Sequence, residues 1–541
     1  MKNSVAIFLC SLFLLTCQKQ EFDVVIRGGN VYDGSGSPPV VADVGINEDT
    51  VAFIGDLSSA IGKKEIDASG LVVAPGFINM LSWAGEELLK DGRSMSNIKQ
   101  GVTLEVFGEG WSPGPRKRKN SSDSSWATLG EFFERLERKG TSTNFASFVG
   151  ATSVRTHELD QENRKPTSEE LERMKQLVHQ AMREGAMGLG SSLIYPPAAF
   201  ADTDELVELC KVASSYGGMY ATHMRSEGDF MLEALNETFA ISSRANIRTE
   251  IYHLKINQSW NWNKIDTVLF KIDSARIAGL EITANMYPYI ASASVLTTRL
   301  PHWVQEGGGN AMRKRLRNKV IRNKVLKEMA LGIPSKNSSP DKVKVLGFGN
   351  DELDSLYKGK FLSEIAALHG KSADETVIDL IIKNRGPISA IFFLISESNM
   401  ERMLSQSYVS LGSDGSSQAI DSLTQSMGTH PRVYGTFARY LGEYVREKKR
   451  MTLEEAIRRI TSMPAENLRI ENRGMIKEGF YADLVLFDPE KIIDRATFDE
   501  PHQYAEGLHH VFVNGIQVLK DGEHTGAMPG RCVRGPGYQK K

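Results

Sequence analysis

The sequence contains little cysteine, almost no net charge and only one long apolar run. Four cysteines occur in 541 residues, and because Cys10 and Cys17 lie near the N-terminus, Cys210 and Cys532 alone make a poor disulfide framework. The 65 basic residues nearly balance the 67 acidic ones, so the charge gives no support for a nucleic-acid-binding protein. With 41% hydrophobic residues, a chain of this length can bury a barrel-sized core beside a second module.

The apolar run, Val5 to Leu15, is too short to cross a bilayer and fits the hydrophobic region of a signal peptide. The "LLTC" that follows resembles the lipobox of bacterial lipoproteins, although Thr16 is less usual there than Gly, Ala or Ser. Residues 1–17 are therefore predicted to be a signal segment, with Cys17 as the lipidated mature N-terminus. Gln18 favours the outer membrane, facing the periplasm, over the inner one. A plain signal peptide with an incidental cysteine is the alternative.

The remaining chain is predicted to form two modules. Residues 22–74 and 470–541 show short strands separated by turn residues, and we expect them to pack together as one composite β-sandwich. Residues 75–469 alternate strands and helices with roughly thirty residues per unit, which predicts an α/β (β/α)8 barrel with functional residues at the C-terminal ends of its strands. The alternation breaks at about 300–363, where we expect an insertion. One helix of the barrel is expected to have Ser168 as its N-cap.

Three polar residues that follow strand-like runs can carry chemistry. They are His223 in "MYATHMRSE", His253 in "EIYHLKI" and Asp414 in "VSLGSDGSS". A lone histidine would be read as structural, but two on successive repeats can share one Zn²⁺, and Asp414 can take a proton from its bound water. A third ligand is needed, and Glu109, between two glycines at the end of a strand, can supply it unless it is an ordinary loop carboxylate.

A histidine pair is missing after the first strand of the predicted barrel. The stretch from Pro75 to Ile78 is a context in which metal-dependent hydrolases usually continue with His-x-His, but here the slot reads Leu81-Ser82-Trp83. This replacement is compatible with a dead hydrolase, with a hydrolase that uses one metal instead of two, or with another kind of protein.

The chain resembles the amidohydrolase superfamily and, within it, the N-acyl-D-amino-acid deacylases (D-aminoacylases), over nearly the whole mature length. The segments that carry the resemblance are "DVVIRGGNVYDGSGSPP", "IDASGLVVAPGFI", "GAMGLGSSLIYPP", "YATHMRSE", "YHLK", "MYPYIAS", "GSDG", "HPRVYGTFARYLG", "MPAENLRIENRGMIKEGFYADLVLFDP" and "EHTGAMPGR". The resemblance implies a distorted TIM (β/α)8 barrel with a small composite β-sandwich, zinc as the cofactor, and hydrolysis of N-acyl-D-amino acids.

The resemblance also implies roles for individual residues. His223 and His253 match the two histidines of the tightly bound zinc, and Asp414 matches the residue that activates water and protonates the leaving nitrogen. Arginine suits a substrate carboxylate because its planar fork meets it in two hydrogen bonds. The residues that match the carboxylate-binding positions are Lys255, Tyr287 and Arg432.

Two departures from the family pattern concern the metal. Leu81 and Trp83 replace the imidazoles of the second, weakly held metal, which the deacylases do not need for turnover. The zinc-binding cysteine of the family aligns with Gly110, and the ligand type within one residue of it is Glu109.

We therefore expect one zinc per chain, held by Glu109, His223 and His253, as in hydrolases with a His₂Glu site. Glu86 or Glu87 could also reach the metal, but both stand in "EELLKDG", which reads as the exposed start of a helix. Two histidines and a carboxylate also suit iron, manganese or cobalt.

The sequence thus predicts a hydrolase of carbon–nitrogen bonds other than peptide bonds, acting on a small molecule such as an N-acyl-D-amino acid. A dipeptidase, or a cyclic amide or lactone hydrolase with the same site, is one alternative. A metal-free barrel kept as a lipid-anchored binding protein is another. The joint presence of His223, His253, Asp414 and the carboxylate-binding residues speaks against the latter, because a dead barrel has no physical need for that set.

Overall fold

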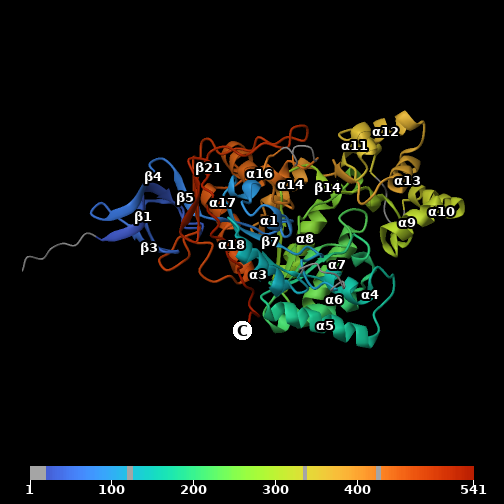
Figure 1. Ribbon diagram of the computed structural model, residues 1–541, viewed down its shortest axis with the longest axis horizontal. Helices are drawn as coiled ribbons and strands as arrows, with labels where there is room; N and C mark the ends of the chain where they lie inside the picture. The colour runs from blue at the N-terminus through green and yellow to red at the C-terminus, as the bar shows by residue number, and fades with distance from the viewer. Residues whose placement is uncertain (1–19, 118–125, 333–337, 422–423, 425–427, 541) are drawn as a thin grey trace, which may run out of the picture.

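The computed structural model describes residues 20–117, 126–332, 338–421, 424 and 428–540. The predicted signal segment and Cys17 lie outside these residues. Figure 1 shows a strand-rich module at one end of the long axis, a barrel in the middle and a helical unit at the other end. None of the helices in the described part of the chain combines the length and apolar character that crossing a bilayer requires.

Both ends of the chain contribute to one sheet, in the order β21-β20-β19-β18-β5-β1-β2-β3, with β4 paired to β1. The link between the ends is the antiparallel pair β18–β5, in which Leu484 faces Pro75 and Phe487 faces Val72. The prediction that both ends of the chain pack together into one β-module is confirmed, and the strands of this predicted sandwich form one connected sheet. The strands are β1 (Glu21–Val31), β2 (Val40–Asn47), β3 (Thr50–Gly55), β4 (Ile61–Asp67), β5 (Val72–Pro75), β18 (Leu484–Phe487), β19 (Leu508–Val513), β20 (Ile516–Lys520) and β21 (Glu523–His524).

The barrel is built from parallel strands that are buried on both faces, as near-continuous apolar runs such as "VTLEVF" require. One ladder runs β6-β7-β8 and another runs β17-β13-β12-β11-β10-β9. The bond from Met80 N to Leu411 O, 3.2 Å, joins their outer ends, so the barrel closes with a distorted ladder. Its strands are β6 (Phe77–Asn79), β7 (Val102–Phe107), β8 (Asn144–Ser147), β9 (Val149–Gly150), β10 (Gly188–Ser192), β11 (Met219–His223), β12 (Thr249–Ile251), β13 (Ile282–Met286) and β17 (Val409–Leu411).

Amphipathic helices cover the outside of the barrel. The prediction that Ser168 is the N-cap of α5 is wrong by one residue: Thr167 caps the helix in a capping box with Glu170, because its side chain accepts from the Glu170 amide. The covering helices include α3 (Leu129–Lys139), α4 (Ala151–Leu159), α5 (Ser168–Arg183), α6 (Thr203–Ser215), α7 (Met231–Ala245), α8 (Ile265–Ile277), α14 (Glu397–Leu404), α16 (Arg432–Arg439), α17 (Leu453–Ile460) and α18 (Ser462–Leu468); the short helices α1 (Glu87–Lys90) and α2 (Met95–Ile98) follow β6.

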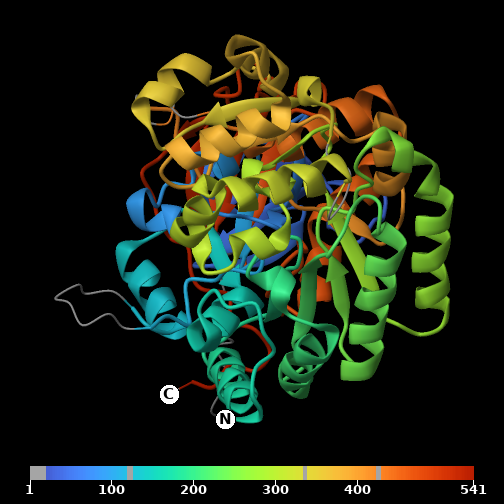
Figure 2. The same ribbon diagram turned by 90° about the vertical axis from the view of Figure 1, so that its right-hand side faces the viewer.

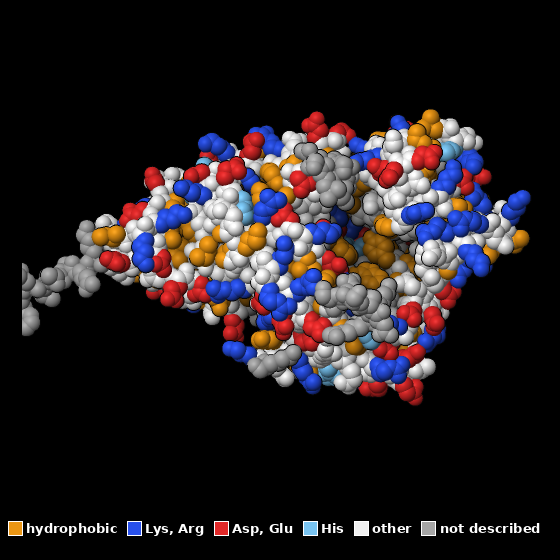
Figure 3. All heavy atoms as spheres, in the orientation of Figure 1, with side chains coloured by type: hydrophobic (Ala, Val, Ile, Leu, Met, Phe, Trp, Pro, Cys, Tyr) orange, Lys and Arg blue, Asp and Glu red, His pale blue; other side chains and the backbone are white. Residues whose placement is uncertain are grey.

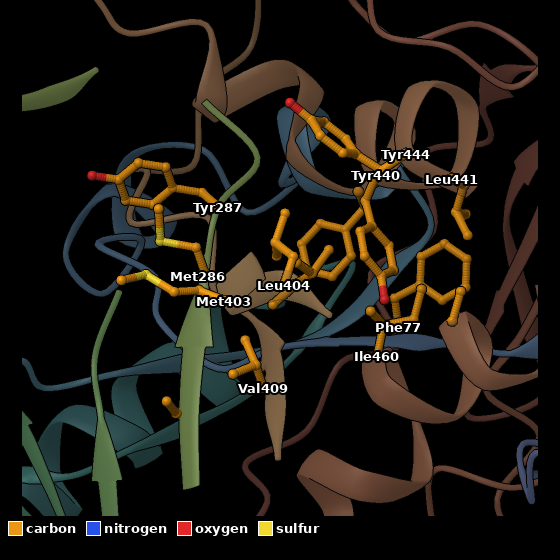
Figure 4. Close-up of a cluster of buried hydrophobic side chains, with 14 of the residues drawn as sticks. Phe77, Met286, Tyr287, Met403, Leu404, Val409, Tyr440, Leu441, Tyr444 and Ile460 are labelled. Carbon is orange, nitrogen blue, oxygen red and sulfur yellow. The ribbon is translucent and has the colours of Figure 1, made fainter. Parts of the chain in front are cut away.

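A continuous apolar core lies between β13, β17 and the helices that follow β17. Figure 4 shows part of it, with Tyr440, from the π-helix Tyr440–Glu447 that continues α16, pointing its hydroxyl toward Phe77 and Ile460. Tyr287 lies at the edge of this cluster, and its hydroxyl points away from the other labelled side chains. The core therefore fixes the strand ends that carry the site.

The inserted unit is larger than the stretch predicted at about 300–363. It has its own sheet, in the order β14-β16-β15, and its own apolar cluster around Leu300, Val345 and Ile378. Figure 2 shows this unit, coloured yellow, over part of the barrel. Its elements are β14 (Ser292–Val295), α9 (Gly308–Arg317), α10 (Lys319–Ala330), β15 (Val343–Gly347), α11 (Asp351–Tyr357), α12 (Leu362–His369), α13 (Ala373–Lys383) and β16 (Ser389–Phe392).

Candidate metal centre

Three side chains that the sequence singled out meet at one edge of the barrel. Glu109 follows β7, His223 is the last residue of β11, and His253 follows β12. Because the strands are parallel, their carboxyl ends lie at the same edge, which is where this fold presents functional groups. All three side chains are buried.

The geometry of these three residues suits a metal ion. Oε1 of Glu109 lies 2.8 Å from Nδ1 of His223 and 3.3 Å from Nε2 of His253. A tetrahedral zinc bonded at about 2.0–2.1 Å needs ligand atoms roughly 3.4 Å apart. Among the residues that the structure describes, this is the only group of three or more metal-ligating side chains whose ligand atoms converge. The three residues therefore fit one metal ion.

The charges around the centre favour a cation. Burial raises the pKa of Glu109, but hydrogen bonds with His223 and His253 outweigh it and lower that pKa to about 2. For His253, burial and the Lys255 charge lower the pKa, whereas Glu227 and Glu109 raise it more strongly, to about 9. Glu109 is thus an anion at neutral pH, and the site attracts positive charge.

Glu227 belongs to this centre, and the sequence analysis missed it. Its Oε1 lies 2.9 Å from Nδ1 of His253 and 2.5 Å from Nζ of Lys255, and Asn257 donates to its Oε2 at 3.1 Å. A carboxylate on the outer nitrogen of a metal-binding histidine fixes its tautomer and ring orientation. The signal was available, since Glu227 ends the motif "YATHMRSE" four residues after His223.

Lys255, predicted to bind a substrate carboxylate, is buried beside the centre. Its Nζ contacts Glu227 and lies 2.7 Å from Nδ1 of His253. Its charge is thereby partly neutralised by Glu227. The predicted role remains a prediction, and in this arrangement Lys255 also holds Glu227, which in turn contacts His253.

Asp414, the predicted proton acceptor, follows β17 and is held at both carboxylate oxygens. Oδ2 lies 2.8 Å from Nη1 of Arg432, and Oδ1 accepts a hydrogen bond of 2.8 Å from the Trp83 indole. The Arg432 guanidinium lies over the ring of Tyr287, 4.7 Å from its centroid. The predicted catalytic and carboxylate-binding residues therefore form one contiguous cluster, although Tyr287 does not line the cavity itself.

The slots that lack the family's ligands are filled by other groups. Leu81 is fully buried in the barrel interior, and Trp83 is 41% exposed at the mouth. Gly110 has a φ of +70°, and a Cβ at this position would lie 2.6 Å from Cβ of Ser192, so the backbone leaves no room for a cysteine. Glu109 is therefore the residue of this turn that can supply the third ligand.

Glu86 and Glu87 do not reach the centre. Glu86 is exposed and pairs with Arg116, and Glu87 pairs with Lys90 on α1. Their side chains face solvent, as predicted for the exposed start of a helix.

A cavity of about 450 Å³ opens onto the three ligands. Asp414, Arg432 and Lys255 line it from the barrel, and Ser292 to Val295 with Thr297 to Arg299 and Phe392 line it from the inserted unit. A second hollow of about 670 Å³ adjoins it and shares Trp83 and Trp111. Figure 3 shows a depression on this face with hydrophobic side chains exposed inside it. The volume of the first cavity is in the range of small-molecule sites.

A parallel barrel with two histidines and a carboxylate converging at its C-terminal edge defines the class of metal-dependent hydrolases. A model described as amidohydrolase family matches residues 367–519. D-aminoacylase of Alcaligenes xylosoxydans xylosoxydans is 32% identical over 525 residues, which cover 95% of this chain and 98% of that protein.

Two solved structures give the same result. One is N-acyl-D-glutamate deacylase from Bordetella bronchiseptica in complex with zinc and a phosphonate inhibitor. It is 28% identical to this chain with a TM-score of 0.79, and the match covers 95% of this chain and 100% of the deacylase. A D-aminoacylase structure that describes one-metal activation and second-metal attenuation of a binuclear centre is 31% identical, with a TM-score of 0.80 and the same coverage. The chain belongs to the amidohydrolases, in the D-aminoacylase branch.

Proposed function

We propose that this chain is a zinc-dependent amidohydrolase that releases the acyl group from N-acyl-D-amino acids. The observation that carries the proposal is the convergence of Glu109, His223 and His253 in the wall of a cavity that also contains Asp414 and Arg432. The names and ligands of the similar proteins, D-aminoacylase and a zinc-bound N-acyl-D-glutamate deacylase, support zinc as the metal and N-acyl-D-amino acids as substrates.

The three ligands would hold one zinc, which when bound supplies Lewis-acid polarisation of the acyl carbonyl and a lowered pKa for water. Asp414 accepts a proton from the attacking water while the water oxygen bonds to the acyl carbon. The carbon–nitrogen bond then breaks, and Asp414 returns the proton to the leaving nitrogen. The products are a carboxylic acid and a free D-amino acid.

The cations near Asp414 are proposed to hold the substrate carboxylate. Arg432 is buried and ion-paired with Asp414, and Nε of this side chain has no hydrogen-bond partner among the described residues. The buried hydroxyl of Tyr287 likewise lacks a partner among them. A carboxylate that accepted from Arg432 would satisfy this side chain and place the acyl carbonyl near the metal ligands, while Tyr287, which lies under the guanidinium and not in the cavity wall, would keep Arg432 in position.

The chain is further proposed to be an exported lipoprotein that is anchored by Cys17 to the outer membrane and faces the periplasm. The "LLTC" motif behind a short apolar run supports this proposal. The test is metabolic labelling with a fatty acid, which should mark the full-length chain and leave a Cys17→Ala variant unlabelled. An unlabelled wild-type chain would contradict it.

The test of the function compares metal content and hydrolysis in wild type, Glu109→Ala and a Glu86→Ala control, all without residues 1–17. We expect about one zinc per wild-type chain, the same in Glu86→Ala, and most of the zinc lost in Glu109→Ala. Wild type should hydrolyse N-acetyl-D-amino acids faster than the L forms. A wild-type chain that binds zinc and hydrolyses neither would contradict the proposal.

A further inference from the structure

We infer that Trp83 is a positioning residue for the reaction, because its indole N–H holds the Asp414 carboxylate in place. The indole contacts this carboxylate where a second metal ion would bind in an enzyme with two metals. The inference rests on the proposed function and adds to it that the enzyme works with one metal at every zinc concentration. Trp83 stands in the slot where the family resemblance places a histidine pair, and its side chain lines the mouth of the cavity.

The first observation is the hydrogen bond itself. Nε1 of Trp83 donates to Oδ1 of Asp414 at 2.8 Å, while Arg432 lies 2.8 Å from Oδ2. Trp83 follows β6 and Arg432 is the first residue of α16, so the hydrogen bond and the ion pair reach the carboxylate from two separate segments of the chain. A carboxylate bound at both oxygens cannot rotate without breaking a charge-assisted contact. Trp83 therefore contributes to the orientation of the group that moves the proton.

The backbone makes this pair rigid. Trp83 N donates to Gly415 O at 2.8 Å, and Asp414 N donates to Leu81 O at 2.9 Å. Ser82 and Gly415 are bridged as parallel neighbours. The exits of the first and last barrel strands are thus joined on either side of the indole–carboxylate bond, and the two side chains share one frame.

The two positions that would supply imidazoles to a second metal, 81 and 83, carry side chains that cannot bind one. The side chain of Leu81 is fully buried in the barrel interior, and the indole of Trp83 offers a donor where a metal ligand must offer a lone pair. Among the described residues, Glu109, His223 and His253 form the only convergent ligand group. A related D-aminoacylase has a binuclear centre with second-metal attenuation. We therefore expect that excess zinc does not attenuate this chain.

The first experiment replaces Trp83 by Phe, which keeps a ring and removes the N–H. The bond is to a charged group, so its loss should lower kcat by about 10- to 100-fold. KM should stay within about twofold and the zinc content should remain one per chain. Trp260→Phe is the matched control, because it removes an indole bond of 2.7 Å to Asp229 from an exposed tryptophan outside the cavity. An unchanged kcat in Trp83→Phe would overturn the positioning role.

The second experiment counts zinc and needs no substrate. Wild type dialysed against excess zinc should retain one equivalent per chain, and the L81H/W83H double variant should gain a second. Two tightly held equivalents in wild type would overturn the inference. Failure of wild type to hydrolyse any N-acyl-D-amino acid would overturn the proposed function instead, while the zinc count would still decide whether the second site is lost.

Discussion

Asp414 and His253 adopt backbone conformations that residues with a Cβ rarely occupy, with φ of +49° and +35°. Such conformations cost about 1–3 kcal/mol and persist where the surroundings enforce them. Here the backbone N–H of Asp414 donates a hydrogen bond to Leu81 O, and the backbone N–H of His253 donates one of 2.8 Å to Oδ1 of Asn285. Local backbone geometry thus directs both side chains of the proposed site.

At this residue scale, Asp414→Asn should retain zinc and lose turnover. Asn can still accept a hydrogen bond from Trp83, but it cannot take a proton from water. Removal of a general base typically lowers kcat by about 10²–10⁴-fold. Zinc analysis and steady-state kinetics on the same preparation check both parts, and normal turnover in this variant would exclude Asp414 as the base.

Glu227→Gln should weaken zinc binding without removing a ligand. Gln keeps the shape but not the charge that His253 and Lys255 face, and loss of an outer carboxylate typically costs about 10- to 100-fold in metal affinity. Competition with a chelator measures the affinity. Glu237→Gln, which alters a carboxylate paired with Arg225 away from the ligands, is the control and should keep wild-type affinity.

At the scale of elements, the barrel interior contains a carboxyl group that the mechanism does not use. Glu250 on β12 is fully buried and faces Thr283 on β13. Asn285 Nδ2 donates to it at 3.0 Å, and the same side chain holds the amide of His253. Burial raises the pKa of Glu250 to about 7 against the opposing effect of its hydrogen bonds. Two neighbouring strands thus connect this group to the site.

This shift makes stability depend on pH. The pKa of Glu250 is higher in the folded chain than the value of about 4.3 in the unfolded chain. The stabilisation that protonated Glu250 gives the folded state is therefore fully present below about pH 4.3 and is lost as the pH rises through about 7. The loss is on the order of 3 kcal/mol. Glu250→Gln should therefore gain stability relative to wild type between pH 5 and pH 8, measured by denaturant unfolding. Parallel curves for the two proteins would contradict the shift.

At the scale of the whole molecule, a buried polar network joins the C-terminal strands to the barrel. Asp483 forms an ion pair with Arg473. Its carboxylate accepts hydrogen bonds from the backbone N–H of Asn514 at 2.8 Å and from the side chain of Asn144 on β8 at 3.2 Å. Asn514 also donates to Asn144 Oδ1 at 2.8 Å. These contacts couple segments that lie hundreds of residues apart, so the sandwich and the barrel share their stability.

Asp483→Ala should destabilise the whole chain. It leaves Arg473 buried without its counter-ion, and breaking a buried pair in this way typically costs about 3–5 kcal/mol. We expect a single unfolding transition at lower temperature, detected by calorimetry. Asp499→Ala is the control, because that exposed carboxylate pairs with Lys344 at the surface and its loss should change little. Separate transitions for two modules would contradict the coupling.

The sequence was sufficient for the barrel and for naming the three residues that converge at its edge, because both depend on local patterns. Strand and helix periodicity gave the barrel, and the position of Glu109, His223 and His253 after strand-like runs placed them at one edge. Glu227 was missed although its motif was visible, because its contact with His253 forms only where the segments after β11 and β12 lie side by side. The inserted unit was predicted too small because its sheet pairs β14 with β16, which lie on either side of the intervening helices.

What the sequence by itself determined is which groups are present: the vacated histidine slot, the three predicted ligands and the acid at position 414. Only the tertiary structure decided what replaced the missing groups. The Trp83 indole meets Asp414 because the exits of β6 and β17 close the barrel side by side, and Gly110 leaves the ligand role to Glu109 because Ser192 of β10 lies against it. Such contacts between strands distant in sequence depend on how the barrel closes, and no local pattern encodes them.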